Sequence, residues 1–355
     1  MSSSVGCSSM AKYGTTVGEA LLGDTLIGTR CYDLEAVETL ASLVLYRIHH
    51  VEADPIRVFV KQEPHKMSKL LTERYRLISA VSLTDTMCDR VMLGWLMKAA
   101  LSSVGLTPIM IGWSPVGPGC RLVSRLFEGK DTRGLDKTAW DWTMKPWLFH
   151  AIYDLILSLA VGAPSWWVDW FEKRWASLFR DAVFQFADGS QVQQTEWAVM
   201  KSGCYLTILL NSVGQLFYHV MAMDAIGKSL DSLKYIVIGD DVTIEDFPEF
   251  SEYEDFILQH GALLKPSEPV KIPEFAGFSF PKWKGIDVYR PEYLDKHVWK
   301  ITHTSLEQLE EVLKSYQLLY AYDDVVLDWI RSVMRKISPA SVISKPALRY
   351  RIMVQ

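Results

Sequence analysis

Acidic residues stand where two short β-rich runs meet. The runs, Tyr235–Ile238 and Val242–Ile244, are separated only by a glycine, Asp240 and Asp241, so we expect a hairpin with two carboxylates at its tip. A third carboxylate, Asp136, closely follows a short extended segment. Hard divalent cations take oxygen ligands of this kind, and two such ions about 4 Å apart can activate an attacking hydroxyl and stabilise a leaving pyrophosphate.

Each acidic feature also has a simpler explanation. Asp and Gly both favour turns, so turn chemistry alone accounts for the acidic tip. Asp136 and Asp141 repeat a carboxylate at a five-residue separation, which solvated acids in a loop would explain. Other motifs in the chain must therefore decide between the two interpretations.

Hydroxyl and amide side chains form a second motif, Ser202-Gly203-x₃-Thr207-x₃-Asn211. Thr207 and Asn211 are four residues apart and would share one helical face, with Ser202 and Gly203 at its entry. That face could present polar groups to a sugar. The alternative is an N-cap followed by a buried helix whose polar residues are satisfied.

Basic residues concentrate between positions 57 and 76. This window holds six bases and two acids in a chain of net charge −5, so an anionic partner would be held by a local patch. Clustered Lys and Arg suit triphosphates or a phosphate backbone. The spacing of Arg74 and Arg76 predicts that both lie on one side of a strand. A solvated charged face is the alternative.

The elements that would position these residues can be predicted from periodicity and turn signals. We expect helices over 33–49, 146–159 and 253–260, a helix after Gly162, and a mainly helical end over 305–337; strands near 57–60 and 135; and hairpins at 183–194 and 275–289. Four Gly and three Pro between Ser102 and Gly119 predict a loop-rich boundary.

Composition indicates a soluble, compact protein of 355 residues with 49% apolar and 22% charged residues. Five widely spaced cysteines argue against a disulfide framework or a zinc site and favour a reducing compartment. The first 23 residues lack the pattern of a secretory signal. The uncharged stretch 202–223 carries several polar residues, so a buried helix is expected there and no membrane anchor.

Taken in order, these motifs resemble motifs F, A, B and C of viral RNA-dependent RNA polymerases, and most closely those of the sobemovirus and polerovirus group and their relatives from invertebrates. The residues that carry the resemblance are Lys61-Gln-Glu63-Pro, Arg74-Tyr-Arg76-Leu-Ile78, Asp136-x₄-Asp141, Ser202-Gly203-x₃-Thr207-x₃-Asn211-Ser212 and Gly239-Asp240-Asp241.

The resemblance implies a role for each site residue. Asp136 and Asp240 would bind two catalytic Mg²⁺ ions, for which Mn²⁺ could substitute, with Asp241 in support. Asp141 and Asn211 would read the ribose 2′-hydroxyl, assisted by Ser202, Gly203 and Thr207. The triphosphate would be held by Lys61, Arg74 and Arg76, and Glu63 would orient one of these bases by an ion pair.

Two further family motifs match less closely. The lysine that protonates pyrophosphate would be Lys265, with Lys271 as the second choice, and an ordinary solvated lysine explains either. The Phe275–Phe278 segment lies where the family has its motif E hairpin, and a packed aromatic hairpin is an equal explanation.

The resemblance implies an α+β right-hand polymerase with an antiparallel palm sheet. The expected lobes are fingers over 1–128 and 161–196, palm over 129–160 and 197–290, and a small helical thumb over 291–355. The implied partners are NTPs, an RNA template and product strand, a genome-linked primer protein and other viral replication proteins. The implied location is the host cytoplasm, in complexes that reach membranes through partners.

Three rival functions stay open at this stage. A reverse transcriptase shares the palm, although the Ile238-Gly239-Asp-Asp turn with Asp141 and Asn211 favours RNA synthesis. A catalytically silent RNA-binding scaffold would keep the fold. A metal-dependent nuclease would use the carboxylates but leaves Ser202 and Asn211 unexplained.

Overall fold

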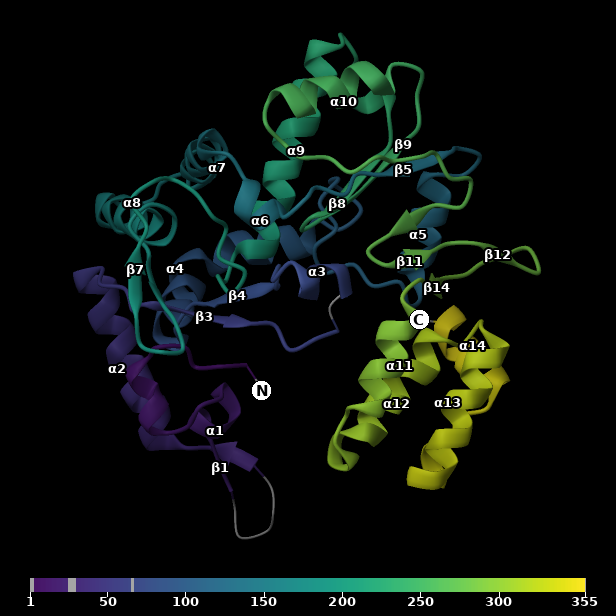
Figure 1. The fold of residues 1–355 in the computed structure, drawn as a ribbon, viewed down its shortest axis with the longest axis horizontal. Coiled ribbons are helices and arrows are strands. Elements are labelled where there is room, and N and C mark those ends of the chain that lie inside the picture. Colours follow the sequence, from purple (N-terminus) through teal and green to yellow (C-terminus); the bar gives the residue numbers. More distant parts are fainter. Residues whose placement is uncertain (1–2, 25–29, 65–66, 355) are drawn as a thin grey trace. The chain divides into compact units, whose positions relative to one another are not determined.

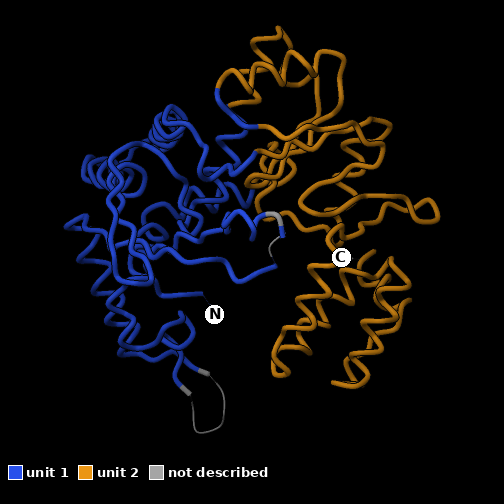
Figure 2. Tube along the Cα trace, in the orientation of Figure 1, with its two compact units in different colours: residues 1–102, 138–217, 261–263 blue, residues 103–137, 218–260, 264–355 orange. Residues whose placement is uncertain are grey.

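The computed structural model of the protein describes residues 3–24, 30–64 and 67–354, and it contains both helices and strands (Figure 1). The chain forms two compact units, each assembled from several stretches of sequence (Figure 2). Unit 1 comprises residues 1–102, 138–217 and 261–263, and unit 2 comprises 103–137, 218–260 and 264–355. These units cut the chain differently from the expected lobes, whose boundaries stay a prediction.

Unit 1 joins the N-terminal third of the chain to its middle. Its elements are η1 (Ser9–Lys12), α1 (Val17–Leu21), β1 (Leu22–Asp24), β2 (Arg30–Tyr32), α2 (Leu34–His50), β3 (Ile56–Val60), α3 (Met67–Leu71), β4 (Leu77–Ala80), α4 (Leu83–Ser102), α6 (Trp140–Thr143), α7 (Pro146–Leu159), α8 (Ser165–Phe179), β6 (Val183–Gln185), β7 (Gln191–Gln193) and the first part of α9 (Thr207–Ala225). The helices predicted over 33–49 and 146–159 are confirmed as α2 and α7.

A four-stranded sheet lies in unit 1, in the order β4-β3-β6-β7. β3 pairs antiparallel with β4 and parallel with β6, and β6 and β7 form the predicted hairpin around Asp188 and Gly189. The parallel pair joins residues 56–57 to residues 184–185, so segments far apart in the sequence share one sheet.

Aromatic side chains pack α7 against α8. The rings of Tyr153 and Phe171 stack with their centroids 5.2 Å apart, and the centroids of Phe149 and Phe179 lie 4.9 Å apart. Phe149, Phe171 and Phe179 are fully buried. Aromatic pairs in this range contribute about 0.5–1.5 kcal/mol beyond their burial, so these rings stabilise the packing of α7 against α8.

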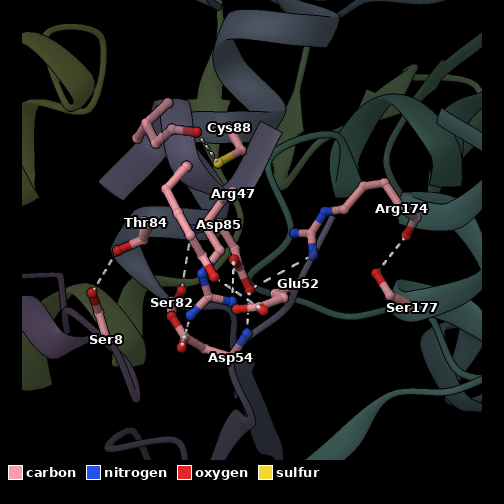
Figure 3. Close-up of polar contacts among 12 residues, drawn as sticks. Ser8, Arg47, Glu52, Asp54, Ser82, Thr84, Asp85, Cys88, Arg174 and Ser177 are labelled. Carbon is pink, nitrogen blue, oxygen red and sulfur yellow. Dashed lines mark hydrogen bonds and ion pairs between the residues drawn. The ribbon is translucent and has the colours of Figure 1, made fainter. Parts of the chain in front are cut away.

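A buried cluster of charged residues ties α4 to α8 and α2 (Figure 3). Arg174 on α8 donates two hydrogen bonds to Asp89, at 2.7 and 2.8 Å. Its guanidinium also lies 3.6 Å from Asp85, and Arg47 on α2 lies 3.8 Å from the same carboxylate. Arg47 pairs in turn with Asp54 at 2.5 Å.

The cluster holds three carboxylates and two guanidinium groups. Burial and the negative charges of Asp54 and Asp89 raise the pKa of Asp85 to about 6, against the opposing effect of Arg174. The folded structure therefore disfavours the ionised form of Asp85.

Unit 2 contains the C-terminal part of the chain and the predicted acidic hairpin. Its elements are α5 (Pro118–Leu126), β5 (Thr132–Gly134), the second part of α9, η2 (Leu230–Ser232), β8 (Tyr235–Ile238), β9 (Asp241–Glu245), α10 (Phe250–Gln259), β10 (Glu274–Phe275), β11 (Phe278–Ser279), β12 (Lys282–Trp283), β13 (Ile286–Asp287), β14 (Arg290–Pro291), α11 (Leu294–Thr302), α12 (Leu306–Leu319), α13 (Asp324–Ile337), η3 (Pro339–Ser341) and α14 (Lys345–Val354).

An antiparallel three-stranded sheet, β5-β9-β8, forms the framework of unit 2. One hydrophobic core joins Ile236 of this sheet to Phe275 on β10, Leu313 on α12 and Ile330 on α13. The C-terminal helices are thus packed onto the strand region through a common core. The helical end predicted over 305–337 is confirmed as α12 and α13.

The loop before α5 and the burial of α9 both agree with the sequence-based expectations. α4 ends at Ser102 and α5 begins at Pro118. One of the boundaries between the units falls at 102–103, at the start of the predicted loop-rich segment. α9 is largely buried, as expected from its apolar residues. None of the helices in the described ranges combines the length and the apolar character needed to cross a bilayer.

Candidate active site

Asp240 and Asp241 lie at the tip of the β8–β9 hairpin. The last cross-strand pair joins Ile238 to Asp241, so Gly239 and Asp240 form a two-residue turn. Gly239 has a φ of 64°, a left-handed conformation that glycine adopts without a Cβ clash. Both aspartates are exposed, whereas the strands behind them are largely buried. The predicted acidic hairpin is therefore confirmed.

Asp136 lies just beyond β5, the strand next to β9. Gly134 pairs with Thr243, and the backbone N–H of Leu135 donates to the carbonyl of Val242 at 3.0 Å. The chain then leaves the sheet beside the first residue of β9, which is Asp241. Strand pairing alone thus brings Asp136 to the acidic end of the hairpin.

The three carboxylates influence one another electrostatically. Partial burial of its carboxyl group, followed by the negative charges of Asp240 and Asp136, raises the pKa of Asp241 to about 6, and Lys296 opposes this effect. Carboxylates that repel each other in this way are stabilised by a nearby cation.

The carboxylates offer the oxygen ligands that Mg²⁺ or Mn²⁺ prefers. Within the described ranges, no three His, Cys, Asp or Glu side chains converge closely enough to form a complete metal-binding group. The fit is therefore one of ligand type and of charge. Burial and the negative charges of Asp240 and Asp136 together raise the pKa of Asp241, and a divalent cation would offset both effects.

Lys265 meets Asp136 through both its backbone and its side chain. Its backbone N–H donates to the carbonyl of Asp136 at 2.9 Å, next to the bridge that pairs Lys137 with Leu264. Its ammonium donates to the Asp136 carboxylate, and both side chains are more than half exposed. Of the two candidate lysines, Lys265 is the one that the structure places at the carboxylates; Lys271 is exposed.

The predicted aromatic hairpin forms beside the same sheet. β10 pairs with β11, and the hydroxyl of Thr243 on β9 donates to the carbonyl of Glu274 at 2.5 Å. Phe275 is buried in the core, where its ring meets Trp113 edge-on. The packing role of this hairpin is thus clear from its contacts.

In unit 1, Asp141 and Asn211 form the centre of a polar group. The side-chain amide of Asn211 on α9 donates to the carboxylate of Asp141 at 2.8 Å. Asn211 is buried, and its amide oxygen accepts no hydrogen bond from the described residues. A buried acceptor without a donor is costly, so this oxygen is suited to receive a hydroxyl from a bound molecule.

Ser202, Gly203 and Thr207 hold the entry of α9 in place. The backbone N–H of Ser79 donates to the Ser202 hydroxyl, and the N–H of Gly203 donates to the Ser79 carbonyl, both at 3.0 Å. A Cβ at position 203 would lie 2.5 Å from that carbonyl oxygen, so only glycine fits. The Thr207 hydroxyl donates to the carbonyls of Lys201 and Cys204. These residues secure the polar group through backbone contacts.

The basic residues also lie in unit 1. Glu63 accepts from Lys61 at 3.0 Å and from Arg76 at 2.7 Å, so it pairs with two of the bases where one pair was expected. These pairs lower the pKa of Glu63 despite its partial burial. The backbone N–H of Lys61 donates to the Arg76 carbonyl at 2.8 Å, which extends the β3–β4 pairing toward these side chains.

The prediction that Arg74 and Arg76 share one side of a strand is wrong. β4 begins only at Leu77, and both arginines precede it. The N–H of Arg74 donates to the carbonyl of Lys69 and closes the end of α3, and Glu73 adopts a left-handed φ of 54°. The turn at Glu73 breaks the alternation on which the prediction rested.

Sequence reasoning assigned no role to Lys201, although it directly precedes Ser202. This lysine is fully buried and lies within a network of hydrogen bonds next to the polar group. A lone lysine before a Ser-Gly pair carries no periodic signal, because its partners come from a loop whose conformation the sequence does not specify.

Comparisons with known proteins identify a family and several relatives of this chain. The profile of the family described as viral RNA-dependent RNA polymerase matches residues 33–264. The replicase polyprotein P2AB of Southern bean mosaic virus is 32% identical over 173 residues, which cover 45% of this chain and 17% of the polyprotein. Protein P1-P2 of potato leafroll virus is 30% identical over 199 residues, covering 51% of the chain and 19% of that protein.

Other relatives are closer in length. The RNA-directed RNA polymerase of mushroom bacilliform virus is 25% identical over 293 residues, covering 79% of this chain and 68% of that protein. Among solved structures, the Sicinivirus 3Dpol RNA-dependent RNA polymerase matches with a TM-score of 0.73 at 17% identity, covering 99% of this chain and 76% of that one. This likeness confirms the expected α+β right-hand fold. The chain spans about a sixth of the length of the polyproteins that it matches.

Proposed function

The chain belongs to the viral RNA-dependent RNA polymerases, with relatives among sobemovirus and polerovirus replicases, and from this membership we propose that it replicates a positive-strand RNA genome. In the proposed reaction, an RNA 3′-hydroxyl attacks the α-phosphate of an NTP that is paired with the template, and pyrophosphate leaves. The carrying observation is the register that brings Asp136 beside the acidic β8–β9 turn, within the residues that match the family.

Asp136 and Asp240 would hold two Mg²⁺ ions, or Mn²⁺ in their place, with Asp241 supporting. When bound, such ions supply charge stabilisation and activation of the attacking hydroxyl. What the chain contributes is a fixed set of carboxylates on buried strands, so little reorganisation is needed as negative charge develops.

Lys265 would serve as the proton donor to the departing pyrophosphate. Its ammonium already lies against Asp136, so it stands at the carboxylates around which the phosphates would be held. A positioned general acid contributes about 10²–10⁴-fold in rate.

Asp141 and Asn211 would select ribose. The Asn211 amide oxygen is buried without a donor among the described residues, which supports a role as acceptor for the sugar 2′-hydroxyl. Lys61, Arg74 and Arg76 would bind the triphosphate, with Glu63 fixing the orientation of Lys61 and Arg76.

We propose the partners on the same basis. RNA template, product strand and NTPs follow from the reaction, and other viral replication proteins follow from the polyprotein relatives. A genome-linked primer protein and host membranes reached through partners belong to the same proposal.

The test is extension of a labelled RNA primer on an RNA template with Mg²⁺, using NTPs or dNTPs in parallel. We expect extension with NTPs by the wild type and by Asp231→Ala, an exposed residue of η2, and none by Asp240→Ala. A preference for dNTPs would indicate a reverse transcriptase, and binding of RNA without extension under any condition would indicate a silent scaffold.

A further inference from the structure

The side chain of Lys201 is buried among oxygen acceptors and aromatic rings. Its side chain is fully buried, and its ammonium donates to Oε1 of Gln194 at 2.6 Å, to the carbonyl of Val199 at 2.9 Å and to that of Ala198 at 3.4 Å. The ring of Phe184 lies 5.1 Å away. All three acceptors are uncharged, and burial lowers the pKa of Lys201 to about 7.

Gln194 holds the other side of the same loop. Its amide nitrogen lies within hydrogen-bond distance of three carbonyls, those of Phe179 (2.6 Å), Glu196 (2.7 Å) and Ala198 (2.9 Å). Gln194 and Lys201 therefore hold the segment between them at both ends, through hydrogen bonds to its carbonyl groups and to each other. Such a network is rigid only while every member is satisfied.

The bracketed loop contains a strained residue. Val199 has a φ of 53°, and the left-handed region costs a β-branched residue about 1–2 kcal/mol. This conformation directs the Val199 carbonyl to the Lys201 ammonium. Strain of this kind persists where the surroundings over-determine it, and here the buried ammonium supplies the constraint.

The loop connects directly to the group that we assign to the sugar. The N–H of Met200 donates to the backbone carbonyl of Asp141 at 2.7 Å. The carbonyl of Lys201 accepts from the Thr207 hydroxyl and from the N–H of Cys204, at the start of the helix that carries Asn211. Lys201 thus links the backbone beside Asp141 to the helix that bears its partner.

We propose that Lys201 is a positioning residue for recognition of the ribose 2′-hydroxyl: its ammonium fixes the 194–200 loop, and the loop fixes Asp141 relative to Asn211. This inference rests on the proposed function and extends it to a residue that would not touch the nucleotide. Without the ammonium, the carbonyl of Val199 and Oε1 of Gln194 lose their donor, and the loop would relax toward a conformation that satisfies them.

The test is the ratio of kcat/KM for an NTP to that for the matching dNTP, measured with primed RNA. In Lys201→Met we expect this ratio to fall by about tenfold, because incorporation of the NTP slows while that of the dNTP changes little. Lys173→Met, an exposed lysine of α8, is the matched control and should keep the wild-type ratio. A lower fraction of folded enzyme reduces both rates equally, so a merely structural role leaves the ratio unchanged.

Gln194→Met removes the hydrogen bonds that hold the other end of the 194–200 loop, so it should lower the NTP to dNTP ratio by a similar factor. The double variant should show no further loss. This variant decides the question should Lys201→Met fail to fold. An unchanged ratio in folded protein would overturn the role of Lys201. Failure of the wild type to extend RNA with NTPs would count against the proposed function instead.

Discussion

The ammonium of Lys265 donates a hydrogen bond to the carboxylate of Asp136, and the backbone N–H of the same lysine donates to the Asp136 carbonyl. The backbone hydrogen bond fixes the position of the Lys265 main chain next to Asp136. The side chain is more than half exposed, so it could rotate from the carboxylate toward another anion. A departing pyrophosphate would be such an anion.

Lys265→Leu should therefore slow the chemical step by about 10²-fold and leave NTP binding nearly intact. The measurement is single-turnover incorporation over a range of NTP concentrations, which separates the maximal rate from the apparent affinity. Lys271→Leu is the control and should behave as wild type. A normal maximal rate in Lys265→Leu would remove this lysine from the proton-transfer role.

Asn211→Ala should abolish much of the preference for ribose. The change deletes the buried amide oxygen and leaves the Asp141 carboxylate without the 2.8 Å hydrogen bond that it receives from Asn211. We expect the NTP to dNTP ratio of kcat/KM to drop by at least about tenfold, the worth of one to two hydrogen bonds. Ile208→Ala, a half-exposed residue on the same helix, provides the comparison. Equal ratios in the two variants would exclude Asn211 as the sugar reader.

Gly203→Ala should destabilise the fold, because the added Cβ would meet the Ser79 carbonyl oxygen at 2.5 Å. We expect the free energy of unfolding to fall by about 1–3 kcal/mol. Gly94→Ala, within α4, has its nearest neighbour at 3.9 Å and should instead stabilise the protein by up to about 1 kcal/mol. Urea unfolding of both variants checks the contrast, and a loss of similar size in each would show that the close approach at Ser79 is not the cause.

The buried cluster predicts different effects on stability when either of two neighbouring aspartates is replaced by asparagine. The folded pKa of Asp85, about 6, lies above its ordinary value of 3.8, so the fold disfavours the ionised form. This penalty is fully present above pH 6 and disappears as the pH falls toward 4. Relative to wild type, Asp85→Asn should therefore gain about 1 kcal/mol in unfolding free energy between pH 5 and pH 8.

Asp89→Asn breaks the paired hydrogen bonds with buried Arg174 and should cost about 3–5 kcal/mol across the same range. Unfolding of both variants at pH 5, 6.5 and 8 distinguishes the two cases. A pH-independent effect of Asp85→Asn would show that the fold does not disfavour the ionised form of this carboxyl group.

Local signals made part of the fold predictable. The β8–β9 hairpin and α7 follow from short β-rich runs around a Gly-Asp turn and from a proline at a helix start, and neither depends on distant residues. The prediction of a strand at Arg74 was wrong because Glu73 adopts a left-handed conformation, which is uncommon for glutamate and could not be expected from the sequence.

Contacts between distant residues could not be predicted. Asp89 and Arg174 are 85 positions apart, and the burial of Lys201 depends on acceptors that a strained valine and Gln194 present. No periodicity in a single sequence encodes such pairings. The motif residues could be predicted because the family resemblance implies a role for each of them. The residues that hold them in place, such as Lys201, could be identified only from the structure.

The strands behind the acidic turn are buried along most of their length, from Tyr235 to Val237 and from Val242 to Ile244. Their amide protons should be among the last in unit 2 to exchange with deuterium, because exposing them requires opening of the whole sheet. Asp240 and Asp241 would then stay in register on the timescale of many turnovers. Heat or denaturant should abolish the chemistry of this turn only when unit 2 itself unfolds.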